Sequence, residues 1–278
     1  MRYRAGIGAM FLFAACGAGG GMQSDRALLP TLVDVSPALW QKLSDRTIYF
    51  GHQSVGDNIL GGVAKILAQE PAIRLEIVKS SDPARWDRPA LAHFAVGTNG
   101  DPDSKTRAFA AAMRAGGGKA DIAFFKFCFW DIRSTTDAAA VFRRYRDTMS
   151  ALRREYPAVV FVHVTVPLTI HRDGLTQRLK SLLGKADAWD LDNLKRAELN
   201  DLLMKEYQGR EPIFDLARAE STLQDGRRTV QMIGGRPAFA LAPGYSRDGA
   251  HLNDDGARWV AVQFLIALAR ATGGTPGG

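Results

Sequence analysis

The chain has 278 residues, of which 46% are hydrophobic and 23% are charged, and its formal net charge at neutral pH is +7. This length allows one substantial core. The body of the chain holds no apolar span of about 20 residues, so no membrane-spanning helix is expected there. Its basic excess is scattered, chiefly over residues 143–154, without the interleaved basic and aromatic pattern of a nucleic-acid groove. We therefore expect a solvated helix face there and no nucleic-acid partner.

The N-terminus differs from the rest of the chain. Arg2 and Arg4 precede a short apolar run at 5–15, a pattern typical of an export signal. The four residues that end at Cys16 resemble a bacterial lipobox, with phenylalanine in place of the usual leucine at the first position. We expect residues 1–25 to be an export signal and a flexible tether, and Cys16 to be lipidated, although a plain secretory signal stays open. The expected location is the periplasm, or the cell envelope through this anchor alone.

Cys128 is the second of the two cysteines, and Cys16 belongs to the expected signal, so no intramolecular disulfide is expected in the mature protein. Its place in an apolar run is typical of a small core residue. We expect residues 26–272 to form a single domain and the glycine-rich tail at 273–278 to be disordered.

From residue 47 onward, apolar strand patterns alternate with amphipathic helix patterns. In chain order, the expected elements are strand 47–50, helix 58–69, strand 74–78, helix 105–115, strand 120–129, helix 137–155, strand 158–166, helix 190–207, strand 212–216 and helix 255–271. The polar segments 79–103, 168–189 and 218–247 are expected to be irregular. The first of these is long enough to indicate a functional loop.

The alternation of strands and helices predicts a three-layer α/β/α fold, with helices on both faces of a central, mostly parallel sheet of about five strands. Ligands bind such sheets beyond the carboxyl ends of the strands. We expect Ser54, the loop at 79–103 and the residues that follow Phe129 and Leu216 to lie at that edge.

Ser54 follows the first expected strand in a small, polar turn flanked by Gly51 and Gly56. A serine in this position projects from the sheet edge, near the free backbone N–H groups of the following helix. These are the requirements of a nucleophile beside an oxyanion site. The alternative is that Ser54 only caps the helix, and taken alone the turn favours the cap.

Asp248 and His251 lie just before the last expected helix. A carboxylate three residues before a histidine can hold one ring nitrogen, which leaves the other nitrogen to take a proton from a serine hydroxyl. This spacing is common by chance, but its place at the end of an α/β chain with an early glycine-flanked serine makes it more specific.

The order of these motifs resembles the SGNH (GDSL-like) hydrolase superfamily over about residues 45–270. Gly51-His52-Gln53-Ser54 is similar to the first block of the superfamily, with one extra residue between the glycine and the serine. The sequence Gly-His-Gln-Ser-Val-Gly at 51–56 resembles a less studied bacterial branch. Asp248 and His251 match the last block. Gly97, with Gly100 as its rival, stands for the glycine of the second block. The third block lacks its asparagine at 127–131, and Asn99 is the candidate to replace it.

The resemblance implies an exported serine ester hydrolase with an SGNH/flavodoxin-like sheet. Ser54 would be the nucleophile, His251 the general base and Asp248 its orienting carboxylate. The oxyanion donors would be Ser54, Gly97 and Asn99. The substrate class implied is an acylated, for example acetylated, carbohydrate or another small ester. We expect a monomer without cofactor or metal. The alternatives are an acyltransferase with the same residues and a non-catalytic binding domain.

Further polar side chains carry expectations of their own. His52 and Gln53 beside the serine either donate to a substrate or hold the turn. Lys126 is unusual in an apolar strand and needs a partner, for which Asp131 and Asp215 are the candidates. Among the other histidines, His163 is expected in the core, and His93 and His171 are expected in loops.

Overall fold

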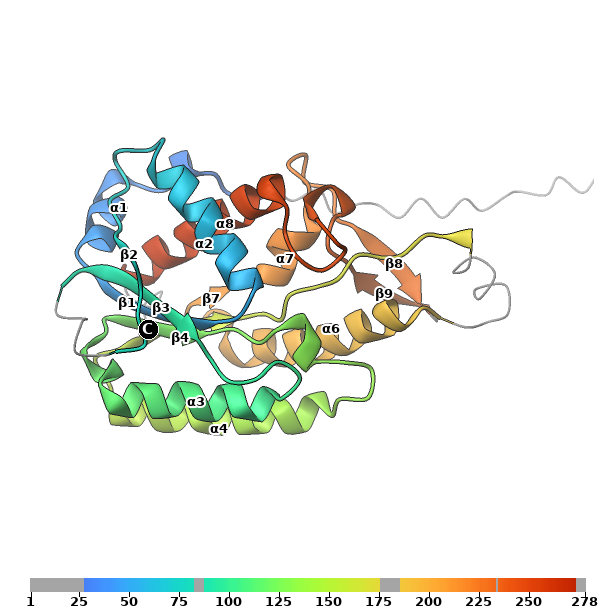
Figure 1. Cartoon of the computed structure of the whole chain (residues 1–278), viewed down its shortest axis with the longest axis horizontal. Helices are drawn as coiled ribbons and strands as arrows, with labels where there is room; N and C mark the ends of the chain where they lie inside the picture. The colour runs from blue at the N-terminus through green and yellow to red at the C-terminus, as the bar shows by residue number, and fades with distance from the viewer. Residues whose placement is uncertain (1–27, 83–87, 176–185, 234, 274–278) are drawn as a thin grey trace, which may run out of the picture.

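The structure of the chain is a computed structural model that describes residues 28–82, 88–175, 186–233 and 235–273. Its centre is a parallel sheet with the strand order β2-β3-β1-β4-β5 (Figure 1). The strands of this sheet are β1 (Thr47–His52), β2 (Ile77–Lys79), β3 (Ala90–Ala95), β4 (Ile122–Phe125) and β5 (Val160–Phe161). Just after β5, β6 (His163–Val164) pairs in parallel with β7 (Ile213–Phe214).

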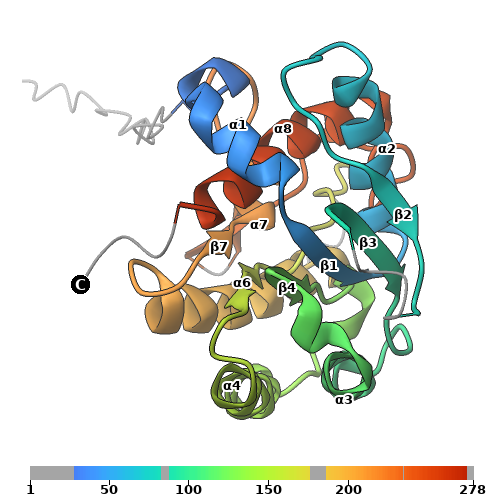
Figure 2. The same cartoon turned by 90° about the vertical axis from the view of Figure 1, so that its left-hand side faces the viewer.

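Helices cover both faces of the sheet. In Figure 2, α1, α2 and α8 lie on one face, and α3, α4 and α6 lie on the other. The helix bounds are α1 (Pro37–Ser44), α2 (Val55–Leu67), α3 (Pro102–Ala115), α4 (Ala138–Glu155), α6 (Ala188–Tyr207), α7 (Leu216–Ser221) and α8 (Asp254–Ala271). The three-layer α/β/α fold expected from the sequence is therefore confirmed.

Alternate residues of β1 enter two separate cores, as the two-residue period of a strand requires. Ile48 and Phe50 belong to the core under α2 and α8. Tyr49 belongs to the core under α3 and α4, where its ring stacks on Phe94 at a centroid distance of 4.5 Å. Because both faces of β1 are buried, its central residues 48–50 are all apolar, and its carboxyl end reaches the sheet edge in a fixed place.

The segment 79–103 is not an irregular loop throughout, because it contains β3. This strand is the neighbour of β1 and carries His93. Its sequence, Ala-Leu-Ala-His-Phe-Ala, has no β-branched residue and lies close to prolines, so local propensity is weak. Pairing with β1 on one side and β2 on the other overrides that propensity.

Three other sequence expectations differ from the structure. Segment 218–247 contains an antiparallel hairpin, β8 (Val230–Ile233) with β9 (Arg236–Phe239). The strand expected at 120–129 is shorter, because the chain leaves the sheet after Phe125 and begins to build a loop. The strand expected at 74–78 is the short edge strand β2.

None of the described helices is long and apolar enough to cross a bilayer. The expected export signal, Cys16 and all but the first residue of the expected tail lie outside the described residues.

Candidate active site

Ser54 lies in the turn between β1 and α2. It is the residue before the first helical turn, with φ −10° and ψ −58°, and its side chain makes no capping hydrogen bond. Its hydroxyl oxygen instead lies 3.0 Å from Nε2 of His251. The turn is tight enough to require glycine at position 56, where a Cβ atom would lie 2.3–2.5 Å from the His52 side chain. The structure therefore does not support the reading of Ser54 as a cap alone.

Asp248 and His251 form one turn before α8. The Oδ2 atom of Asp248 lies 2.7 Å from Nδ1 of His251, and its Oδ1 atom accepts the backbone N–H groups of Ala250 and His251. Gly249 closes this turn at φ +96°, in the region that favours glycine. Burial acts to raise the pKa of Asp248, but the hydrogen bonds from His251 and Ala250 outweigh it and lower the pKa to about 2.

The charged Asp248 carboxylate determines the tautomer of the His251 imidazole. Because the carboxylate accepts from Nδ1, that nitrogen carries the proton and Nε2 presents its lone pair to the Ser54 hydroxyl. The edge of the ring packs against Phe129, at a centroid distance of 5.5 Å and an angle of 81°. The ring is thus held both by a carboxylate and by an aromatic wall.

Ser54 and His251 are 197 residues apart in sequence. They precede α2 and α8, and these two helices pack side by side (Figure 1). A Cβ atom at Gly62 of α2 would lie 2.3 Å from the carbonyl oxygen of Ala257 in α8, so this close helix contact requires glycine. Asn58 of α2 accepts the backbone N–H of Leu252 at 3.2 Å. No local pattern in the sequence marks Asn58 or Gly62, since their partners are far away in the chain.

The loop after β3 brings Gly97 and Asn99 to the same edge of the sheet. Gly97 has φ +56°, and a Cβ atom there would lie 2.6 Å from the backbone of Lys105. Gln53 donates from Nε2 to the carbonyl oxygens of Val96 and Gly97, at 3.1 and 2.8 Å. Gln53 therefore joins the serine turn to this loop, which corresponds to the turn-holding alternative of the two raised for it.

Asn99 is exposed and held at one end only. Its Oδ1 atom accepts from Nζ of Lys105 at 2.7 Å. Its Nδ2 group, like the backbone N–H groups of Ser54 and Gly97, has no acceptor among the described residues. Three donors on two neighbouring loops at the edge that carries Ser54 are thus available to a ligand.

A buried ion pair lies beneath this loop. Nζ of Lys105 lies 2.8 Å from Oδ2 of Asp131, and neither side chain is exposed to solvent. Asp131 also accepts the backbone N–H groups of Gly100 and Cys128, at 2.8 and 2.6 Å. The pair therefore connects α3 and the end of β4 to the loop that carries Asn99. Lys105 is not evident as a functional residue from the sequence, because nothing in a helix sequence marks one lysine as buried.

Asp131 is thus occupied by Lys105 and is not the direct partner of Lys126. Asp215, the other candidate, accepts from the Thr165 hydroxyl and from the backbone N–H of Arg218. The Lys126 ammonium donates to the carbonyl oxygen of Phe127 at 3.4 Å, and burial lowers its pKa to about 8. The expectation of a direct carboxylate partner for Lys126 is therefore wrong.

The remaining histidines lie apart from the serine hydroxyl. His52 is buried, and its Nε2 lies 2.9 Å from Nδ1 of His93, so its ring faces β3 and not the open edge. His93 lies on β3, which corrects its placement in a loop. His163 is fully buried in β6, between Tyr145 and Glu211, as expected for a core histidine.

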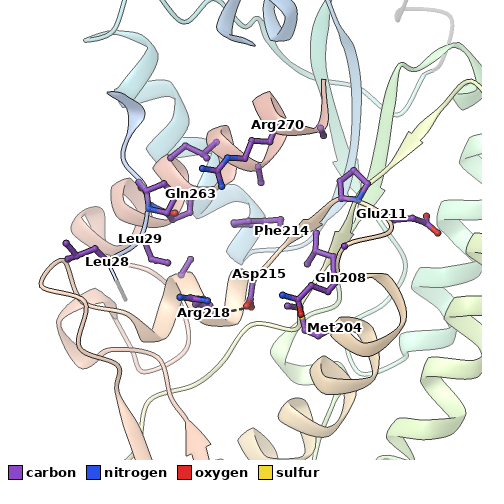
Figure 3. Close-up of a pocket in the computed structure, with 18 residues that line it drawn as sticks. Leu28, Leu29, Met204, Gln208, Glu211, Phe214, Asp215, Arg218, Gln263 and Arg270 are labelled. Carbon is purple, nitrogen blue, oxygen red and sulfur yellow. Dashed lines mark hydrogen bonds between the residues drawn. The ribbon is translucent and has the colours of Figure 1, made fainter. Parts of the chain in front are cut away.

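A separate cavity of about 490 Å³ lies among α6, β7, α7 and the carboxyl-terminal half of α8 (Figure 3). Phe214, Asp215, Gln263 and Arg270 are among its lining residues. The serine turn packs near the opposite end of α8, and no candidate residue of the ester site lines this cavity.

The protein is thus an α/β protein in which Ser54, His251 and Asp248 are linked by consecutive hydrogen bonds at the edge of the sheet. No protein-family model matches the chain, and a search of curated proteins gives no match either. Solved structures of carbohydrate esterases and of a GDSL-like lipase are similar in fold at low sequence identity.

Three of these structures illustrate the level of similarity. A protein of Streptococcus pneumonia described as a platelet activating factor is 13% identical, with a TM-score of 0.47, over 85% of this chain and 94% of its own. A carbohydrate esterase family 3 protein from Talaromyces cellulolyticus is 15% identical, with a TM-score of 0.45, over 81% and 97%. An acetylxylan esterase from Geobacillus stearothermophilus is 13% identical, with a TM-score of 0.43, over 81% and 94%. Similarity at this level does not bear on the substrate.

Proposed function

We propose that this protein is a serine ester hydrolase of the SGNH type, which removes acyl groups such as acetyl from a carbohydrate or another small ester. The observation that carries the proposal is the hydrogen-bond sequence from the Ser54 hydroxyl to His251 and on to Asp248, at 3.0 and 2.7 Å. A nucleophile, a base within reach of it and a carboxylate that orients the base are the three parts of this chemistry.

In the proposed reaction, the Ser54 oxygen attacks the ester carbonyl carbon while Nε2 of His251 takes the hydroxyl proton. The tetrahedral intermediate collapses when the imidazolium returns that proton to the leaving alcohol, which leaves an acyl group on Ser54. A water molecule then attacks the acyl carbon while His251 takes its proton. The bond from the acyl carbon to the Ser54 oxygen breaks as the imidazolium returns that proton to Ser54, and the acid is released. Asp248 holds the imidazole in the required tautomer and stabilises the imidazolium through its charge.

The negative oxygen of the intermediate would be bound by the backbone N–H groups of Ser54 and Gly97 and by Nδ2 of Asn99. These groups have no acceptor among the described residues, which supports their role as donors to a ligand. Asn99 would replace the asparagine that the SGNH superfamily carries in its third block. Donors fixed before the substrate arrives stabilise developing charge without reorganisation.

The proposal includes a location. Residues 1–25 would direct export, and a lipid on Cys16 would hold the protein at the cell envelope, where acylated polymers are available as substrates. Fractionation of cells that express the native chain and Cys16→Ser tests this part by itself. Native protein in the soluble exported fraction would contradict the lipid anchor but not the hydrolase.

The hydrolase is tested by acid release from acetylated glycans and from small chromogenic acetate esters. Ser54→Ala should lower kcat/KM by at least about a thousandfold, because the nucleophile is lost. Ser44→Ala is the matched control, since that hydroxyl only donates to the carbonyl of Trp40 within α1. Wild-type activity in Ser54→Ala would refute the proposal. Transfer of acetyl to an added glycan in place of acid release would identify an acyltransferase.

A further inference from the structure

A second group of functional side chains lies beneath the serine turn. His52 ends β1, His93 lies in β3, and Asp57 is in the first turn of α2. One nitrogen or oxygen atom from each lies within 4.8 Å of the atoms from the other two. The ester chemistry proposed above uses none of them.

The hydrogen bonds of His52 determine which of its nitrogens is free. Its Nδ1 faces the carbonyl oxygen of Gln53 at 3.4 Å and is therefore the protonated nitrogen. Its Nε2 then presents a lone pair to His93, whose Nδ1 lies 2.9 Å away. A histidine whose other ring nitrogen donates to a carbonyl is in the arrangement that metal-binding histidines adopt.

The spacing of the two rings suits a metal ion. The present contact requires one proton between the two nitrogens, and a bound cation would take the place of that proton. Zinc binds imidazole nitrogen at about 2.0–2.1 Å, so two nitrogens of a tetrahedral site lie roughly 3.3 Å apart. The distance between Nε2 of His52 and Nδ1 of His93 would thus increase from 2.9 Å. A small rotation of the two rings provides this change, and their planes now lie at 20° to each other.

The charges of the group are also suitable. Imidazole binds a metal ion in its neutral form, and both rings are buried, so Asp57 is the charged ligand of the group. Asp57 is exposed, and its carboxylate has no hydrogen bond or ion pair among the described residues. The opposing charges are Lys126, whose pKa burial lowers to about 8, and Lys79, which is exposed and therefore screened by water.

We propose that His52, His93 and Asp57 bind one divalent transition-metal ion of the zinc type, with water at the remaining position. Two imidazoles and one carboxylate are ligands that zinc accepts, whereas magnesium and calcium prefer oxygen ligands alone. The ion would join the ends of β1 and β3 to the first turn of α2, the segments that surround Ser54. This site does not depend on the ester chemistry.

The test uses tag-free, EDTA-treated protein that is dialysed against zinc and then assayed for metal content and for competition with a chromogenic chelator. Wild type should hold about one zinc ion per chain. Asp57→Asn and His93→Gln should each weaken binding by at least about tenfold. His171→Gln is the matched control, because that histidine is bonded to Asp190 elsewhere, and it should bind as wild type does.

Zinc should also raise the Tm of wild type and of His171→Gln, and raise it less in Asp57→Asn, since only a ligand bound to the folded state stabilises it. Magnesium at the same concentration should leave the Tm unchanged. Asp57→Asn decides the question if His93→Gln does not fold, because Asp57 is exposed and the change preserves its size. Zinc binding by wild type no tighter than by Asp57→Asn would overturn the proposal.

Discussion

Replacement of Lys105 by methionine tests the buried ion pair that supports the Asn99 loop. Methionine retains most of the apolar stem but removes the ammonium from Asp131 and Asn99. The carboxylate of Asp131 would remain fully buried, with only the backbone N–H groups of Gly100 and Cys128 as partners. Lys105→Met should therefore destabilise the fold and loosen the side-chain amide of Asn99.

The magnitude follows from the burial of both partners. Removal of one member of a buried pair costs about 3–5 kcal/mol, because the other charge is left uncompensated. Since two backbone donors still reach Asp131, we expect the lower end, about 3 kcal/mol. For a chain of this size, each kcal/mol shifts the Tm by roughly 2–4 °C, so the expected decrease is roughly 6–12 °C.

Thermal unfolding followed by circular dichroism measures this shift. Arg114→Met is the matched control on the same helix, because its ion pair with Glu155 is exposed to solvent and should contribute little to stability. Lys105→Met combined with Asp131→Asn should be less destabilised than Lys105→Met alone, since no buried charge is left unpaired. A Tm for Lys105→Met no lower than that of Arg114→Met would refute the reasoning.

The remaining predictions concern the ester site and its pH dependence. Ser54→Ala and His251→Ala should each lower kcat/KM by at least about a thousandfold, and the double variant should be little worse, because the residues act as a unit. Additive losses in steady-state assays would contradict this. Asn99→Ala should lower kcat by roughly a hundredfold, with a smaller Tm decrease than Lys105→Met, and an unchanged kcat would exclude it as an oxyanion donor. In the folded protein the pKa of His52 is lowered to about 3. Between about pH 6.5 and pH 3, His52 therefore binds a proton in the unfolded chain but not in the folded chain. As the pH falls through this range, His52 lowers the free energy of unfolding by up to about 1.4 kcal/mol per pH unit. Burial raises the pKa of Glu220 to about 8, and this group acts in the opposite direction. The test therefore measures the free energy of unfolding of wild type and of His52→Gln as a function of pH between about pH 6.5 and 3. Equal slopes in the two proteins would contradict the prediction.

Much of the fold and of the candidate site can be read from local patterns. Apolar runs that alternate with amphipathic helices predict the layers, because each pattern depends only on which faces of an element are buried. Ser54, Asp248 and His251 stand out for a similar reason. A glycine-flanked turn and an Asp-x-x-His spacing are short-range features, and the parallel topology directs both to one edge.

Other features depend on contacts that no local pattern contains. The strand β3 has weak propensity, and it forms because β1 and β2 provide ladder partners on both sides. The partner of Asp131 is Lys105 and not Lys126, although Lys126 is the lysine that an apolar strand makes conspicuous. Lys105 reaches Asp131 because the fold brings α3 beside the turn at Phe129–Asp131.

The same distinction explains the histidines. In the sequence His52 looks like a residue beside the nucleophile, but the alternation of a strand places its side chain on the same sheet face as His93 of β3, and their ring nitrogens lie 2.9 Å apart. The two residues are 41 positions apart, and β3 itself is not evident from its sequence. The sequence by itself therefore determined the layers and the serine, histidine and aspartate of the candidate site. Only the tertiary structure decided what supports them, because buried charges and rings select partners by distance in space and not by position in the chain.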